Sequence, residues 1–234
     1  MRPEDPDEDV AARLDRAGLA RLIDHTILRP EAGRDEVARE AALAVEWGCA
    51  SICVQPEHVA HVVSIVGDRI PVATVVGFPH GATLSSVKAH EAAAAVAHGA
   101  REVDVVASLG AIADDDLDAV REDVAAVRAA VPGVVLKVIV ESALWSPPVL
   151  RTAAAAVLDG GADHVKTSTG FHPAGGATPE AVALLRVVAG TRARVKASGG
   201  LRSLADCEAV LRAGADRLGL SATGAVLAEL GETA

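Results

Sequence analysis

The strongest constraint on the fold is a repeat of short apolar segments along a chain of 234 residues. Each segment is rich in Val, Ile or Ala, and all but the last are followed by a clear helical pattern. The eight predicted strands recur every 22 to 33 residues and end near Leu28, Gln55, Phe78, Ser108, Glu141, Thr169, Gly199 and Ser221. Alternating strands and helices with near-continuous apolar strands indicate a parallel sheet covered by helices.

Eight such units in about 250 residues predict an α/β protein with a single closed (β/α)8 TIM barrel. A doubly wound open sheet is the alternative, but no Gly-x-Gly-x-x-Gly motif follows the first predicted strand and no second domain is visible. Residues 10–22 predict an extra N-terminal helix. We therefore expect a flexible acidic tail over residues 1–9 and a barrel domain over residues 10–234.

Charge and composition exclude several classes of partner. A net charge of −10 argues against a general surface for nucleic acid or for an anionic membrane. No run of 18 apolar residues is present to cross a membrane. The three cysteines, Cys49, Cys53 and Cys207, are odd in number and show no metal-ligand clustering. We therefore expect them to be free thiols and the protein to be located in the reducing cytoplasm.

Lysine usage points to a reactive site. Among 22 lysines and arginines only four are lysines, namely Lys88, Lys137, Lys166 and Lys196. The last three lie in apolar predicted strands, and Lys166 and Lys196 are each followed by a serine two residues later. Lysine, unlike arginine, loses its proton readily when buried or beside another cation, and can then attack a carbonyl. The matched strands favour two ammonium groups converging on one site over two structural ion-pair partners.

Strand periodicity assigns faces to the first of these lysines. The predicted strand His164–Thr169 places Lys166 and Ser168 on one face, and Val165, Thr167 and Thr169 on the other.

A carboxylate in another apolar strand is the natural companion of these lysines. Asp104 interrupts the apolar run of residues 102–107, and carboxylates are rarely buried without a partner. It either forms an ion pair with a strand lysine or moves protons beside a lysine nucleophile, and the two roles are compatible. Asp24 and Lys137 raise the same question, and Cys53 is close enough to a strand end to line a pocket.

Glycines after the last two strands predict a phosphate site. Ser198-Gly199-Gly200 follows the seventh strand, and residues 219–224 follow the eighth with two further glycines. Phosphate often binds beyond strands 7 and 8 of such barrels, where glycines let backbone N–H groups approach an anion. The histidines with the most suggestive positions share no ligand spacing, so we predict no metal at His25, His80, His164 or His172.

Six motifs in the same order resemble the deoxyribose-phosphate aldolase family over residues 22–224. They are Ile23-Asp24-His25-Thr26, Thr74-Val75-Val76-Gly77-Phe78-Pro79, Glu102-Val103-Asp104-Val105-Val106, Leu136-Lys137-Val138-Ile139-Val140-Glu141, Val165-Lys166-Thr167-Ser168-Thr169-Gly170-Phe171 and Val195-Lys196-Ala197-Ser198-Gly199-Gly200. The family is a metal-free class I aldolase on a (β/α)8 barrel. It reversibly cleaves 2-deoxy-D-ribose 5-phosphate to glyceraldehyde 3-phosphate and acetaldehyde.

The resemblance implies a role for each motif residue. Lys166 becomes the Schiff-base lysine, Lys196 its neighbouring lysine and Asp104 the acid/base partner, with no cofactor. The predicted substrate-binding residues are Asp24, Thr26, Cys53, Lys137, Thr169, Gly170, Gly199, Gly200 and Ser221. The expected partners are a phosphorylated deoxysugar and small aldehydes, with a homodimer as a possible assembly.

Four positions depart from the family pattern. Arg29 stands where the family usually has Lys, Gln55 and Ser108 stand where Asn is common, and Ala222 replaces the second serine after strand 8. None of these departures touches the catalytic trio, although Ala222 puts the strength of phosphate binding in question. The alternative functions are a class I aldolase of another phosphorylated sugar and a sugar-phosphate-binding barrel without catalysis.

Overall fold

The computed structural model describes residues 15–231, and its centre is a closed barrel of eight parallel strands in sequential order. The strands are β1 (Ile23–Ile27), β2 (Ser51–Val54), β3 (Val72–Val76), β4 (Glu102–Val106), β5 (Val135–Ile139), β6 (His164–Lys166), β7 (Arg194–Ser198) and β8 (Arg217–Leu220). Pairing of β8 with β1 closes the barrel, which confirms the (β/α)8 prediction and excludes the open sheet.

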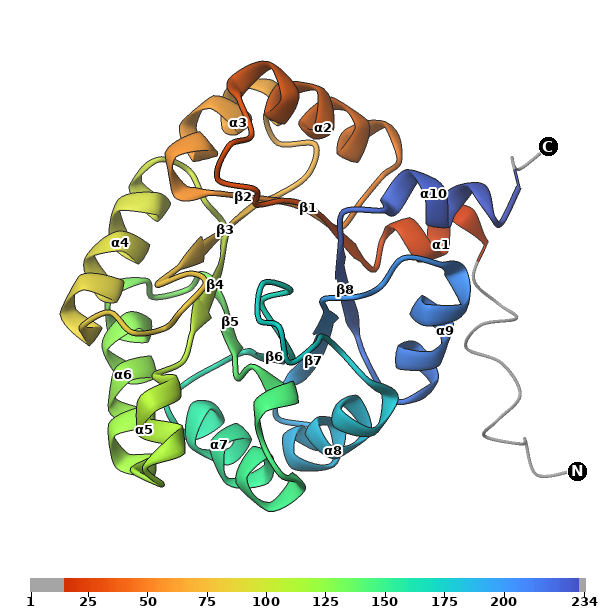
Figure 1. Ribbon diagram of the computed structural model, residues 1–234. Coiled ribbons are helices and arrows are strands. Elements are labelled where there is room, and N and C mark those ends of the chain that lie inside the picture. The colour runs from red at the N-terminus through yellow and green to blue at the C-terminus, as the bar shows by residue number, and fades with distance from the viewer. Residues whose placement is uncertain (1–14, 232–234) are drawn as a thin grey trace, which may run out of the picture.

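Helices surround the barrel on its outside, as Figure 1 shows in a view along the barrel axis. The α-helices are α1 (Arg16–Ala20), α2 (Arg34–Glu46), α3 (Val59–Val66), α4 (Ser85–Ala97), α5 (Leu109–Ala113), α6 (Leu117–Ala130), α7 (Pro147–Asp159), α8 (Pro179–Ala189), α9 (Leu204–Arg212) and α10 (Thr223–Ala228). Two short 3₁₀ helices, η1 (Pro56–His58) and η2 (Ser142–Leu144), follow β2 and β5. None of the helices within residues 15–231 is long and apolar enough to cross a membrane.

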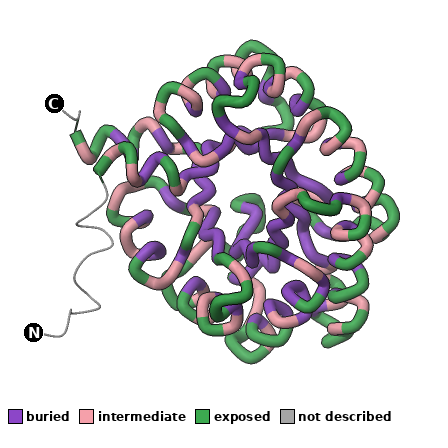
Figure 2. Tube along the Cα trace, turned by 180° about the vertical axis from the view of Figure 1, so that it is seen from behind, coloured by how far each residue is buried: buried purple, intermediate pink, exposed green. Residues whose placement is uncertain are grey.

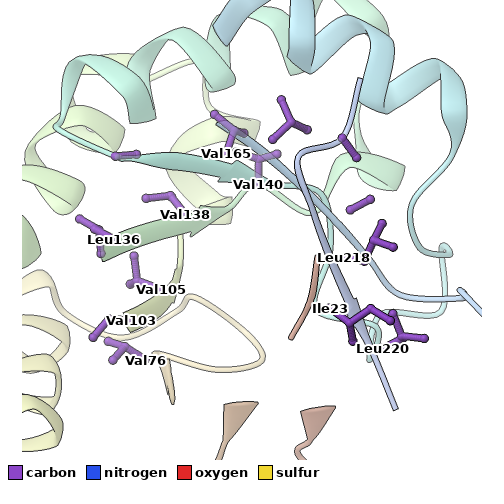
Figure 3. Close-up of a cluster of buried hydrophobic side chains, with 14 of the residues drawn as sticks. Ile23, Val76, Val103, Val105, Leu136, Val138, Val140, Val165, Leu218 and Leu220 are labelled. Atoms are coloured by element: carbon purple, nitrogen blue, oxygen red, sulfur yellow. The ribbon is translucent and has the colours of Figure 1, made fainter. Parts of the chain in front are cut away.

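The apolar core lies between the strands and the surrounding helices. In β4, Val103 and Val105 are buried on the outer side, where Figure 3 shows them with apolar residues of β3, β5, β6 and β8. Because side chains alternate along a strand, Glu102 and Asp104 point into the barrel instead. Consecutive residues of most strands are buried, so both faces of these strands are shielded from solvent, and the strands form the purple ring at the centre of Figure 2.

Capping side chains mark the starts of two helices. Thr178 accepts a hydrogen bond from the backbone N–H of Ala181 ahead of Pro179 at the first turn of α8. Ser203 and Asp206 form a reciprocal capping box at the start of α9. The predicted N-terminal helix is present as α1, which packs beside α10 (Figure 1). The predicted tail (residues 1–9) and residues 10–14 lie outside the described residues, so the domain boundaries stay predictions.

The sixth strand was predicted wrongly at its C-terminal end. It runs only from His164 to Lys166, although the backbone N–H of Thr167 still donates to the Lys196 carbonyl oxygen of β7. Thr167 and Thr169 instead satisfy their hydroxyls locally, with the Ser198 carbonyl oxygen and the Glu141 carboxylate. The alternation assigned from sequence therefore ends at Lys166, which allows Thr169 to line the same cavity as Lys166.

One buried lysine was not anticipated. Lys88 on α4 is fully buried, and its ammonium lies 2.7 Å from the Asp123 carboxylate on α6 and donates to the Val106 carbonyl oxygen at the end of β4. A buried ion pair of this kind is tolerated only when both charges are paired and hydrogen-bonded. Lys88 thus attaches two outer helices to β4, on the opposite side of that strand from Asp104.

Candidate active site

Three lysine ammonium groups converge on one carboxylate inside the barrel. The Oδ2 atom of Asp104 accepts from Lys166 at 2.8 Å and from Lys196 at 2.7 Å, and its Oδ1 atom accepts from Lys137 at 2.8 Å. All four side chains are buried. The predicted catalytic trio is therefore brought together, with Lys137 as a fourth member.

A second carboxylate holds the other side of Lys196. Asp24 on β1 accepts from the Lys196 ammonium, from the Ser51 hydroxyl at 2.6 Å and from the Arg217 guanidinium at 2.7 Å. The sequence analysis assigned Asp24 to substrate binding, but the structure places it beneath the site as a partner of Lys196.

Strand register produces this convergence. Asp104 is aligned with Lys137 on the neighbouring strand, and Lys166 is aligned with Lys196. Lys137 is aligned with His164, two residues before Lys166. The side chains of all four residues point into the barrel, so their charged ends meet at Asp104 although they start from different register positions. A slip of one residue in any of these strands would turn its charge outward, into the apolar layer.

Burial and charge set opposite protonation tendencies on the two lysines of β6 and β7. Burial, followed by the nearby Lys196 ammonium, lowers the pKa of Lys166 even though Asp104 opposes the shift. Burial also disfavours the charged form of Lys196, but Asp104 and Asp24 outweigh it and raise its pKa. The ammonium groups around Asp104 hold the pKa of that carboxyl well below its usual range despite its burial. Lys166 is therefore the lysine best able to present a free amine.

Lys166 forms part of the wall of a cavity of about 390 Å³ at the C-terminal end of the barrel. The predicted substrate-binding residues that line the same cavity are Thr26, Thr169, Gly170, Gly199, Gly200 and Ser221. Asp104 and Lys196 lie outside this lining, behind Lys166, so the cavity meets the charged cluster through the one lysine with a lowered pKa.

Close backbone packing explains why glycines border the cavity. Gly170 and Gly199 both have positive φ, at 79° and 84°, and a side chain on Gly199 would lie 3.1 Å from the Cα atoms of Gly170 and Gly176. A side chain on Gly176 would lie 2.1 Å from the Gly199 carbonyl oxygen, which rules it out sterically. The loops after β6 and β7 therefore pack backbone against backbone and present main chain to the cavity.

Two other predicted substrate-binding residues do not line the cavity. Lys137 is buried between Asp104 and Glu102, 2.5 Å from the Glu102 carboxylate. Cys53 packs in a small apolar cluster with Leu28, Ala73 and Val75, and burial raises the pKa of its thiol to about 11. Cys53 is therefore neutral at pH 7, and like the other two cysteines it is a buried free thiol, as expected.

Several residues of the site were missed in the sequence. Glu102 and Arg217 lie beside the lysines, although strand alternation places Glu102 on the same face as Asp104 and could have identified it. Glu141, buried with a φ of 50°, accepts from the backbone N–H and the hydroxyl of Thr169 and so fixes that residue at the cavity. Arg202 is an exposed residue of the cavity lining and lies two residues after Gly200 of the Gly-Gly motif.

The departures from the family pattern lie away from the cluster. Arg29 is exposed at the cavity rim and pairs with Glu31 and Glu36, and Gln55 donates to the Leu28 carbonyl oxygen. Within residues 15–231, no group of three or more His, Cys, Asp or Glu side chains is arranged to hold a metal ion.

Comparison with known proteins decides the family. Residues 19–227 match the family model described as DeoC/LacD family aldolase. The chain belongs to this family. The match includes the whole barrel and the buried charged cluster, and it confirms the aldolase class predicted from the six motifs.

Individual members of the aldolase family are similar over nearly their whole length. The deoxyribose-phosphate aldolase of Mycobacterium tuberculosis (strain ATCC 25618 / H37Rv) is 56% identical over 216 residues, which cover 91% of this chain and 96% of that protein. The deoxyribose-phosphate aldolase of Mycobacterium avium (strain 104) is 54% identical over 220 residues, covering 92% of this chain and 98% of that protein. Among solved structures, the tetrameric deoxyribose phosphate aldolase of Aeropyrum pernix has a TM-score of 0.86 at 32% identity, covering 94% of both chains.

The Lys196→Leu variant tests how the pKa of Lys166 is set. A lysine with an ordinary pKa of ~10.4 is neutral in about one molecule in 2,500 at pH 7. Removing the Lys196 charge takes away one cause of the lowered pKa and leaves Asp104 less neutralised, so the pKa of Lys166 should rise. We expect slower imine formation with acetaldehyde at neutral pH and a midpoint at higher pH. An unchanged midpoint in the folded variant would mean that burial alone lowers the pKa of Lys166.

Proposed function

We propose that this chain reversibly cleaves 2-deoxy-D-ribose 5-phosphate to D-glyceraldehyde 3-phosphate and acetaldehyde, with Lys166 as the Schiff-base lysine. The observation that carries this proposal is the position of Lys166: its amine reaches a cavity wall while its pKa is lowered. The proposal agrees with the reaction named for the relatives that share more than half of the sequence.

The first step uses the free amine of Lys166. Its nitrogen attacks the C1 aldehyde of the open-chain sugar, and loss of water from the resulting carbinolamine gives a protonated imine. The imine withdraws electrons from C2 far better than the aldehyde does. Lys196 keeps its positive charge between two carboxylates, so it favours the neutral amine of Lys166 before the attack.

The second step breaks the C2–C3 bond. The C3 hydroxyl gives up its proton, C3 leaves as the aldehyde of glyceraldehyde 3-phosphate, and the bonding electrons form an enamine between C2 and C1. Protonation at C2 and addition of water then release acetaldehyde and regenerate the lysine. We assign these proton transfers to Asp104, which lies 2.8 Å from the Lys166 nitrogen, acting through water because Asp104 is fully buried.

The phosphate group is assigned to the far side of the cavity. Gly170, Gly199, Gly200 and Ser221 border it there, and the exposed Arg202 follows the glycine pair. Backbone N–H groups at glycine-rich turns and a guanidinium both suit a phosphate dianion. Thr26 and Thr169 line the same cavity as Lys166 and are assigned to the sugar hydroxyls.

We also propose a cellular location and an assembly. Three buried free thiols and a phosphorylated metabolite as substrate suit a reducing cytoplasm. A homodimer is the proposed assembly of this chain, whereas the relative from Aeropyrum pernix is described as a tetramer. The molar mass in solution separates the two.

Trapping the imine tests the proposal directly. We expect acetaldehyde followed by borohydride to give one covalent adduct, which peptide mass mapping should place on Lys166. The fully buried Lys88 is a control within the same chain, because it is paired with Asp123 outside the site and should stay unmodified. Activity should survive exhaustive chelation, since the amine itself activates the carbonyl. An adduct confined to Lys196 would reverse the lysine roles, and activity restored only by a divalent metal would exclude the imine route.

The Asp104→Asn variant separates a proton-transfer role from a structural one. Asn keeps the shape and part of the hydrogen bonding but cannot accept the proton, so kcat should fall by about 10²–10⁴-fold. Acetaldehyde should still add to Lys166, while exchange of its methyl protons with deuterated solvent should nearly stop. The measurement is deuterium incorporation by NMR beside borohydride trapping. Near-normal exchange in the folded variant would leave Asp104 as only an ion-pair partner.

A further inference from the structure

The charged groups inside the barrel form a closed ring of alternating sign. Its members, in order, are Asp104, Lys196, Asp24, Arg217, Glu102 and Lys137, which returns to Asp104. The Arg217 guanidinium is 2.7 Å from Asp24 and 2.8 Å from Glu102, and Lys137 is 2.5 Å from Glu102. Lys137 also lies 3.6 Å from Asp24 across the ring. Each cation therefore lies between two carboxylates, and each carboxylate lies between two cations.

Lys166 is the one charged group attached to this ring from outside. It contacts Asp104 alone, whereas the ring without it contains three carboxylates and three cations. Within residues 15–231, the seven groups form ion pairs only with one another. The ring is thus electrically neutral without Lys166, and a proton on Lys166 adds one uncompensated charge in a buried site. Uncompensated buried charge is costly, and the group that can relieve it by losing a proton does so.

Two ring members lie far from the cavity. Glu102 is the first residue of β4 and Arg217 the first residue of β8, at the opposite end of the barrel from the strand ends that form the cavity. Neither lines the cavity, and neither contacts Lys166. Arginine keeps its proton at all accessible pH values, so Arg217 is a permanent charge in the ring. A change of charge at this end reaches Lys166 only through the field of the ring.

We propose that Glu102 and Arg217 are positioning residues which fix the charge balance of the ring and thereby make Lys166 the lysine that gives up its proton. This inference rests on the proposed role of Lys166 as the Schiff-base lysine. It assigns a function in the reaction to the end of the barrel that carries no substrate.

The other titratable groups near Lys166 do not alter the count of charges. Cys53 on β2 lies close enough to Asp104 and the lysines to interact with their charges, and burial raises the pKa of its thiol to about 11. His164 on β6 is buried, and burial followed by Lys137 and Arg217 lowers its pKa to about 4. Both are therefore neutral at pH 7. At the cavity rim, Arg29 pairs with Glu36, and Glu40 and Arg202 lie among the lining residues.

Two single substitutions of opposite charge give the test its sign. Arg217→Met makes the ring negative, so the pKa of Lys166 should rise and the pH midpoint of imine formation should move upward. Glu102→Gln makes the ring positive, so the midpoint should move downward. We expect each substitution to shift the pH midpoint of imine formation by on the order of one pH unit. The double variant, which removes one charge of each sign, should return the midpoint to the value of the unchanged protein.

The readout is the rate of acetaldehyde adduct formation at Lys166 in the presence of cyanoborohydride, measured across pH. Arg101→Met is the matched control, because Arg101 precedes Glu102 but pairs with Asp68 on the surface, and its midpoint should not move. Circular dichroism establishes that each variant is folded. If Arg217→Met does not fold, the downward shift in the isosteric Glu102→Gln variant decides the sign.

Two results would overturn the inference. One is an unchanged midpoint in folded Glu102→Gln and Arg217→Met variants, and the other is a shift in the same direction in both, which would indicate only a loosened barrel. Failure of the proposed function looks different, because the unchanged protein would then form no adduct at Lys166 at any pH.

Discussion

The contacts between the Asp104 carboxylate and the side-chain nitrogens of three lysines are the interactions on which the site depends. These contacts join β4, β5, β6 and β7 inside the barrel. The reactive lysine is therefore positioned correctly only when all four strands are in the correct register. Removing one partner from a buried ion pair typically costs about 3–5 kcal/mol, because the remaining charge has neither water nor a counter-charge. A slipped register would leave such a charge unpaired, so the cluster disfavours other registers of these four strands.

The composition of the cluster explains why lysine and arginine are not exchangeable within it. Arg217 remains charged and can contact two carboxylates through its fixed fork of donors, so it suits the end of the barrel away from the cavity. Lysine can lose its proton, and of the three lysines only Lys166 has a single carboxylate partner and a place in the cavity wall. The pKa values of Lys166 and Lys196 thus shift in opposite directions because Lys166 has one carboxylate partner and Lys196 has two.

The features of the fold and the site that depend on local or periodic sequence patterns could be predicted from the sequence. The spacing of apolar segments predicted the barrel. The rarity of lysine and its place in apolar strands pointed to Lys166 and Lys196, and a carboxylate within an apolar strand pointed to Asp104. Sequence reasoning could not reach contacts created by barrel closure: the Asp24 carboxylate meets Lys196 and Arg217 although 172 and 193 residues separate them in the chain. It also extended the sixth strand to Thr169, because β-branched residues there resemble a strand. The Thr167 hydroxyl instead donates to Ser198 of β7, and the Thr169 hydroxyl donates to Glu141 after β5. Asp24 and Lys137 were predicted to bind substrate because their ion pairs with Lys196, Arg217, Asp104 and Glu102 exist only in the closed barrel.

The protonation state of Lys166 can be observed directly because the chain has only four lysines. Protein labelled with ¹³C at the lysine Cε should give one NMR signal each for Lys88, Lys137, Lys166 and Lys196, and the signal missing from the Lys166→Met variant assigns the reactive group. A titration should show the Lys166 signal changing at a pH below the ordinary lysine pKa of ~10.4, while the Lys137 and Lys196 signals remain those of ammonium groups through that range. A Lys166 signal that titrates together with or above those of Lys137 and Lys196 would contradict the account.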